Sequence, residues 1–279
     1  MLKLKIRLFF LEHKIITYLI LILSMLLIMS KISFKISMPN DPTTIGVLGT
    51  LLGAIVGGLF SLIGSIYVNN KKIISESEIK KKNVIYRPLY DELLDTKKII
   101  EIENRYPTYV RYQKGQQTIT RHPQITAWQR ICSDSRILDT PNVLKEQYQR
   151  YLKSIENYTK VRNEANEIIQ SVINKTVKDE IGKENTITNL GSCLSDEILD
   201  NTLTGNKLKS YWHLSGEDEN SNDKWDEVAS KISSKCNNFE EIKTIRNAYN
   251  DWISIQDETI KLLELLILEI NIKYEKQRR

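Results

Sequence analysis

TTIGVLGTLLGAIVGGLFSLIGSIYVN, residues 43–69, belongs to the longest uncharged segment of the chain and sets its predicted architecture. No charged residue occurs from Ile45 to Val68, which as a helix corresponds to about 36 Å at ~1.5 Å per residue. This length exceeds the ~30 Å thickness of a bilayer's hydrocarbon core. Residues 44–68 are therefore predicted to form a transmembrane helix.

The same segment holds six of the chain's eleven glycines. In water each would cost ~1 kcal/mol relative to alanine, whereas in a bilayer small residues let a second helix approach closely. Gly49, Gly53, Gly57 and Ser61 recur every four residues on one side of the helix, and further small residues extend the pattern over 46–65. We expect this side to bind a helix, either in the same chain or in a second copy of it. The alternative is that glycine is simply common in membrane helices.

A second apolar segment lies nearer the start of the chain. Residues 15–30 carry no charge, and apolar residues resume beyond Lys31, whose side chain can reach the interface. A secretory signal peptide usually ends in a small-residue cleavage pattern, and no alanine occurs before Ala54. We therefore predict an uncleaved transmembrane helix at about residues 14–36, which gives a membrane domain over 1–69.

The distribution of charge predicts the orientation in the membrane. Residues 1–90 have a net charge of +8, and residues 91–279 have a net charge of −3. Basic residues flank both apolar segments on the sides away from the connector at 37–44. Positively charged flanks of membrane spans stay on the cytoplasmic side. We therefore expect a bacterial-type inner (plasma) membrane protein with both termini in the cytoplasm. The odd number of cysteines, three, suits a reducing compartment.

Residues 70–279 are predicted to form a cytoplasmic, mainly α-helical domain. Two long segments, 140–181 and 239–279, have mostly apolar residues spaced three and four positions apart, as in coiled coils. We call these the seam positions, because they would lie on the side of the helix that packs against its neighbour. In the first segment these are Leu144, Tyr148, Tyr151, Ile155, Tyr158, Val161, Ala165, Ile168 and Val172. In the second they are Ile242, Ile245, Tyr249, Trp252, Gln256, Ile260, Leu263, Ile267, Ile270 and Tyr274. The two helices are expected to pack antiparallel as the axis of a bundle, the first ending at Gly182.

The sequence lacks the common catalytic signatures. It has no phosphate-binding loop, no His-Glu-x-x-His motif, no Cys-x-x-Cys pair and no Gly-x-Ser-x-Gly turn. Its three histidines are far apart in the sequence. We therefore predict no catalytic residues, no metal site and no cofactor.

One stretch is a candidate binding site. Residues 105–136 contain six Lys or Arg and one acidic residue, with aromatic residues between them. Guanidinium groups bind phosphate with two hydrogen bonds, and aromatic faces stack on bases. The candidate anion-binding residues are Arg111, Arg121, His122, Trp128, Arg130 and Arg136. The alternative is that the arginines pair with the acidic faces of the two long helices while the aromatic residues fill the core.

Two classes of function follow. The favoured one is a non-enzymatic membrane protein whose cytoplasmic domain senses, scaffolds or acts as an effector, for instance in a defence or stress system. Its expected partners are the bilayer, a second copy of the chain and a cytoplasmic protein, and nucleic acid is not expected. The alternative is a membrane-localised enzyme or ligand-binding protein that uses residues 105–136 for a nucleotide, nucleic acid or other anion.

Overall fold

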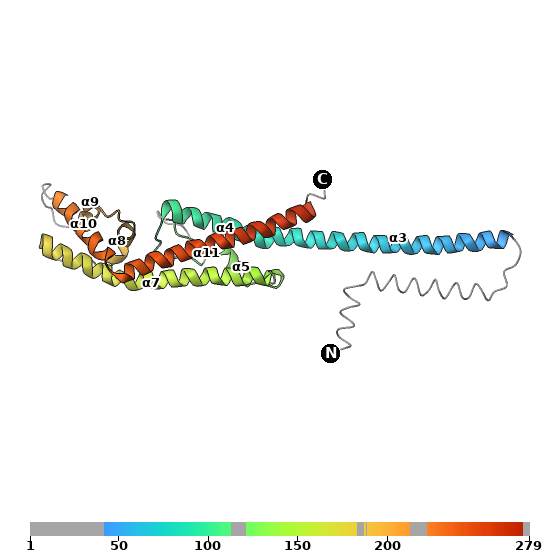
Figure 1. Ribbon diagram of the computed structural model, residues 1–279, viewed down its shortest axis with the longest axis horizontal. Helices are drawn as coiled ribbons and strands as arrows, with labels where there is room; N and C mark the ends of the chain where they lie inside the picture. Colours follow the sequence, from blue (N-terminus) through green and yellow to red (C-terminus); the bar gives the residue numbers. More distant parts are fainter. Residues whose placement is uncertain (1–41, 113–120, 183–186, 188, 213–221, 276–279) are drawn as a thin grey trace, which may run out of the picture. The chain divides into compact units, whose positions relative to one another are not determined.

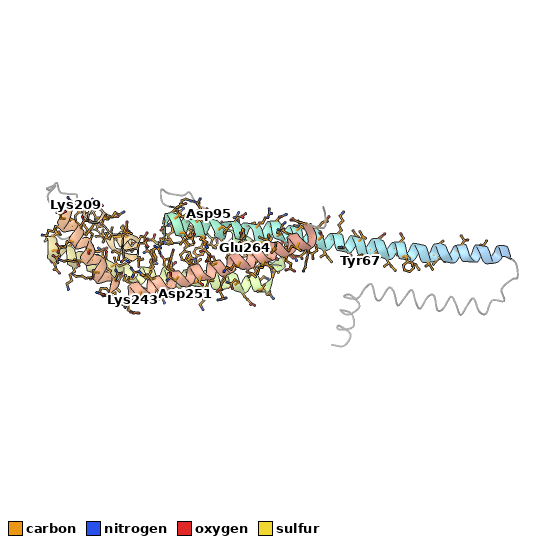
Figure 2. All side chains as sticks on the ribbon, turned by 45° about the horizontal axis from the view of Figure 1, so that its top comes forward. Tyr67, Asp95, Lys209, Lys243, Asp251 and Glu264 are labelled. Carbon is orange, nitrogen blue, oxygen red and sulfur yellow. The ribbon has the colours of Figure 1, made fainter. Side chains whose placement is uncertain are left out.

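The helix α3 (Pro42–Lys81) contains the uncharged segment and continues beyond it. Its apolar side chains are exposed: Val47 and Phe60 are 69% and 67% accessible. Tyr67 also projects from this helix (Figure 2). Among the residues that the structure describes, one helical stretch is long and apolar enough to cross a membrane, and its most apolar window lies within α3 with nothing packed over it.

The computed structural model describes residues 42–112, 121–182, 187, 189–212 and 222–275. These residues are mainly helical and contain no β-strand (Figure 1). The predicted first span at 14–36 lies outside them. The chain divides into two compact units, Met1–Glu76 and Ser77–Arg279. The expected domain boundary at 69/70 falls inside α3, because the helix continues through polar residues after the apolar segment ends.

After α3 the chain continues through three short helical segments. These are a π-helical turn η1 (Lys82–Tyr86), the helix α4 (Arg87–Lys98) and a second π-helical turn η2 (Ile99–Glu103). Pro88 lies in the first turn of α4 and has no N–H to donate to the carbonyl of Val84, four residues earlier. The Arg136 guanidinium donates to that carbonyl instead, at 3.2 Å. A side chain from elsewhere in the domain thus completes the helix at the proline.

Lys82 joins the start of the second unit to the end of the chain. Its side chain is buried, and its Nζ donates to Asn271 Oδ1 at 2.9 Å and to the Glu275 carboxylate. Both partners belong to the π-helical segment η4 (Asn271–Glu275). Burying a charged ammonium group is unfavourable unless it is paired, and these two partners compensate for the burial of Lys82.

The two long helices of the bundle are α7 (Asn142–Ile181) and α11 (Glu240–Ile270) (Figure 1). Gln147 donates to Thr259 at 3.3 Å, and the rings of Tyr158 and Trp252 are 5.1 Å apart. Because residue numbers rise along α7 as they fall along α11, the helices run in opposite directions. α7 ends at Gly182, whose φ of 77° is a left-handed conformation that glycine adopts readily.

The expected seam positions are largely buried. In α11, positions 242, 245, 249, 252, 256, 260, 263 and 270 are buried, and 267 and 274 are partly exposed. In α7 the seam is buried from 144 to 158 and again at Ala165, but Arg162, Ile169 and Ile173 are buried where 161, 168 and 172 were expected, and those three are partly exposed. Three of the four expected positions at this end were therefore wrong by one residue. The reason is that Arg162, a charged residue, occupies a core position.

Shorter helices complete the bundle. They are α5 (Ala127–Cys132), α6 (Arg136–Asp139), α8 (Leu190–Leu199), α9 (Gly205–Ser210) and α10 (Asn222–Asn237). Gly191 in α8 donates its N–H to Gln170 Oε1 at 2.6 Å. A Cβ at this position would lie 2.2 Å from the carbonyl oxygen of Asn166, so only glycine allows α8 to approach α7 this closely.

Candidate functional site

The basic and aromatic segment lies between η2 and α7, and side chains of α7 hold its backbone in place. Tyr158 Oη donates to the carbonyl of Pro107 at 3.1 Å. Arg162, one helical turn later, donates to the carbonyl of Tyr106 through Nε at 3.1 Å and through an Nη atom at 2.9 Å. Two side chains of one helix therefore fix two consecutive carbonyls of an irregular segment.

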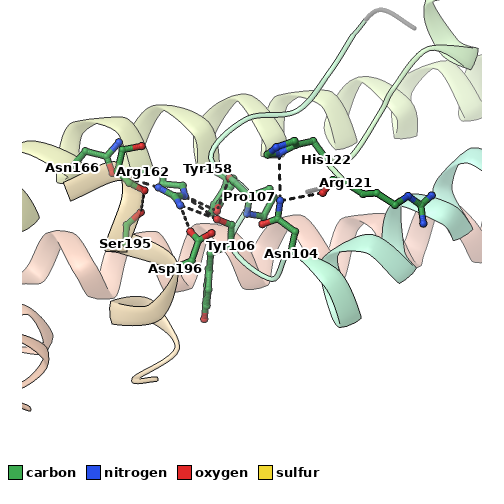
Figure 3. Close-up of polar contacts among 11 residues, drawn as sticks. Asn104, Tyr106, Pro107, Arg121, His122, Tyr158, Arg162, Asn166, Ser195 and Asp196 are labelled. Atoms are coloured by element: carbon green, nitrogen blue, oxygen red, sulfur yellow. Dashed lines mark hydrogen bonds and ion pairs between the residues drawn. The ribbon is translucent and has the colours of Figure 1, made fainter. Parts of the chain in front are cut away.

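Arg162 is the centre of a buried polar network (Figure 3). It is 0% exposed, and besides Tyr106 it contacts the Tyr158 hydroxyl at 3.2 Å and forms an ion pair with Asp196 of α8. Burial raises the pKa of Asp196 to about 6, and the Arg162 guanidinium acts in the opposite direction. The network therefore connects three parts of the fold: α7, the segment that contains Tyr106, and α8.

A second polar group surrounds His122. Asn104 lies 3.3 Å from His122 Nδ1 and donates to the carbonyl of Arg121 at 3.2 Å (Figure 3). The imidazole stacks on Tyr109 with ring centroids 3.9 Å apart, and Arg111 donates to the Tyr109 hydroxyl at 3.2 Å. Burial, followed by the positive charge of Arg111, lowers the pKa of His122. The structure therefore brings together two of the predicted anion-binding residues, Arg111 and His122.

Two other predicted arginines have acidic partners. Arg121 pairs with Asp95 at 2.9 Å and with Glu103 at 2.8 Å. Arg136 pairs with Asp134 at 2.7 Å, in addition to its bond to the Val84 carbonyl. These acidic partners lie on α4, on η2 and just before α6. The arginines therefore pair within the domain, but not with the long helices that the alternative interpretation named.

The remaining two predicted residues lie together on α5. Trp128 is 3% exposed and stacks on Tyr148, with ring centroids 4.4 Å apart. The side chain of Arg130 is exposed and makes long hydrogen bonds, 3.4 Å, to Thr126 at the start of the same helix. The carboxylate of Glu92 completes this helix start by accepting from the backbone N–H groups of Thr126 and Ala127 at 2.7 and 2.8 Å.

A pocket of about 500 Å³ opens beside these groups. It is lined by aromatic residues, amides and a pair of opposite charges: Tyr109, Val110, Tyr112, Trp128, Gln129, Leu152, Glu156, Thr159, Lys160 and Asn163. Of the six predicted anion-binding residues, Trp128 alone is among them. The described part of the chain contains no group of three or more His, Cys, Asp or Glu residues arranged to hold a metal ion.

The predicted helix-association residues lie on α3. Gly49, Gly53, Gly57 and Ser61 are exposed, and a Cβ added at any of the three glycines meets nothing within 4 Å. The side of the helix that they form is open in the described structure.

Sequence reasoning missed Arg162, Asn104 and Asp196. Arg162 alone had a recognisable signal, since it continues the seam spacing 144, 148, 151, 155 and 158. A scan against models of protein families, a search of curated proteins and a search of solved structures each find no match to this chain.

Proposed function

We propose that this chain is a two-span inner-membrane protein whose cytoplasmic helical domain acts as a sensing, scaffolding or effector module without enzymatic activity. The observation that carries the proposal is α3: an exposed apolar helix that leads directly into a packed helical bundle. Exposed apolar surface of this extent is stable in a bilayer and unstable in water.

The proposed topology has spans at about 14–36 and 44–68 and both termini in the cytoplasm. It is supported by the basic residues that precede the first span and follow the second. Two buried basic side chains of the bundle are paired with carboxylates, Arg162 with Asp196 and Lys82 with Glu275. A domain stabilised in this way suits a role in holding or transmitting a conformation.

Reporter fusions test this topology. A reporter that is active only in the cytoplasm is fused after Arg279 or inserted in the connector at 37–44. We expect activity from the first fusion and none from the second. An inactive reporter after Arg279 would contradict the orientation, and recovery of the chain in the soluble fraction would contradict membrane insertion.

A second candidate is binding of an anionic ligand, such as a nucleotide, by residues 105–136. It is favoured by the pocket that Trp128 and Gln129 line. Arg130 follows them in α5 with an exposed side chain that is not part of the lining. Calorimetric titration of the full chain with ATP tests it. The second candidate requires binding that Arg130→Gln weakens and Arg150→Gln leaves unchanged.

A further inference from the structure

The pocket of about 500 Å³ that residues of α5 and α7 line has aromatic walls supported from behind. Tyr109 lines it and stacks on His122, with ring centroids 3.9 Å apart. Trp128 lines it and stacks on Tyr148, with ring centroids 4.4 Å apart. These contacts hold both rings in place from within the protein, and small-molecule sites are usually pre-formed in this way.

The backbone that carries Tyr109 and Tyr112 is also held in place. The N–H of Arg111 donates to the carbonyl of Pro123 at 2.8 Å, and the N–H of Ile125 donates to the carbonyl of Arg111 at 2.8 Å. These bonds join this part of the lining to the residues that lead into α5. The volume of the pocket also falls within the ~300–1,000 Å³ of typical small-molecule sites.

The lining carries one charge of each sign, Glu156 and Lys160, one turn apart on α7. Glu and Lys at this spacing commonly pair on a helix. Here Lys160 Nζ lies 4.0 Å from Glu164 instead, and the Glu156 carboxylate has no hydrogen bond or ion pair with any residue that the structure describes. Burial, followed by the negative charge of Glu156, raises the pKa of Tyr112, so this carboxylate lies near the Tyr112 hydroxyl. Glu156 is therefore able to bind a cationic group inside the pocket.

The rest of the lining is neutral. Gln129 and Asn163 contribute exposed carboxamides, which can both donate and accept hydrogen bonds. Val110 and Leu152 add apolar surface beside the aromatic rings. Because the one acidic and the one basic residue cancel in formal charge, the lining favours neither a polyanion nor a simple cation.

We infer that this pocket binds a free α-amino acid with an aromatic side chain. The ammonium group would pair with Glu156 and the carboxylate with Lys160, since charge-assisted hydrogen bonds are stronger than neutral ones. The ring would pack against Tyr109 and Tyr112, which are 42% and 39% exposed. A zwitterion of this kind uses both charges of the lining and its aromatic walls at once.

The inference deepens the second candidate function and rests on it for the position of the ligand. It changes the expected ligand from an anion to a zwitterion. It does not depend on membrane insertion, since every residue of the lining belongs to the second compact unit.

Ligand-observed fluorine NMR of the full chain in nanodiscs tests the class of ligand. Three probes share one ring and differ in charge: para-fluoro-L-phenylalanine is a zwitterion, para-fluorophenethylamine a cation and para-fluorophenylpropionate an anion. We expect the amino acid to bind about tenfold more tightly than either analogue, because each analogue lacks one charge-assisted hydrogen bond. Fluorotryptophan serves as a second amino acid with an aromatic side chain.

Variants of α7 locate the bound probe. Glu156→Gln and Lys160→Gln should each weaken binding of the amino acid about tenfold, since each removes one charged partner. Glu167→Gln and Lys153→Gln make the same changes at exposed positions of α7 outside the lining, and they should leave the affinity unchanged.

Each other outcome overturns the inference in a distinguishable way. Tighter binding of the propionate would restore the anion, and tighter binding of the amine would assign a cation to the pocket. Equal affinities in the lining variants and their controls would place the probe outside the pocket. If neither amino acid binds above the level of empty nanodiscs, the inference is wrong, and the ATP titration still decides the second candidate by itself.

Discussion

Arg162 has no exposed surface, and its guanidinium donates to Tyr158 and Asn166 of its own helix and to Tyr106 and Asp196 outside it. Replacing it with methionine keeps the apolar stem but leaves the Tyr106 carbonyl and Asp196 without their donor. Breaking a buried ion pair costs about 3–5 kcal/mol, and we expect the lower end because the Asp196 side chain is 43% exposed.

Denaturant unfolding of Arg162→Met measures this cost. Lys160→Met is the control on the same helix, since Lys160 is 71% exposed and its distance to Glu164 is 4.0 Å. An exposed pair contributes at most about 1 kcal/mol. Equal stability losses in the two variants would show that the Arg162 network contributes little.

His122 predicts a dependence of stability on pH. Burial and Arg111 lower its pKa in the folded state below the ~6.5 of an unfolded chain. The unfolded state therefore binds the proton first, and the stabilisation present above pH 6.5 is lost as the pH falls toward 5. His122→Phe keeps a ring against Tyr109 and cannot titrate, so its stability should fall less than that of the wild type between pH 7 and 5. Parallel pH profiles would contradict the assignment.

At the scale of helices, α11 was the most predictable element. Its buried positions follow the apolar pattern because few charged residues interrupt that side of the helix. In α7 the same reasoning failed at Arg162, since a hydrophobic pattern assigns arginine to the surface. The buried guanidinium is stabilised by the Tyr106 carbonyl and by Asp196, whose positions depend on tertiary structure. The candidate site was less predictable for the same reason, because the sequence does not reveal which arginines have partners.

Leu263 and Leu265 test the packing of α11. Leu263 is 0% exposed and Leu265 is 64% exposed, although they are two residues apart on one helix. Leu263→Asp buries a carboxylate among apolar groups, which costs several kcal/mol and is comparable to the stability of a domain. Leu265→Asp places the same group in water. In detergent, we expect the first variant to lose cooperative melting and the second to melt near the wild type. Similar melting of both would contradict the packing of this helix.

At the scale of the whole molecule, the open side of α3 predicts self-association. An isoleucine at Gly53 would hold a neighbouring helix away and remove the close backbone contacts that favour association in lipid. Gly53→Ile should therefore abolish crosslinked multimers in membranes while insertion is retained. Leu51→Ile, on the same helix but outside the row Gly49, Gly53 and Gly57, is the control. Multimers that persist in Gly53→Ile would assign the glycines to a helix of the same chain.

The Lys82 junction has a consequence for the synthesis of the protein. Its partners Asn271 and Glu275 follow it by 189 and 193 positions. At ~5–20 residues per second, the ribosome needs roughly 10–40 s to add this length of chain. During that interval Lys82 has neither partner, so the junction closes only after residues 271–275 have been synthesised. A product that terminates before Asn271 never closes it.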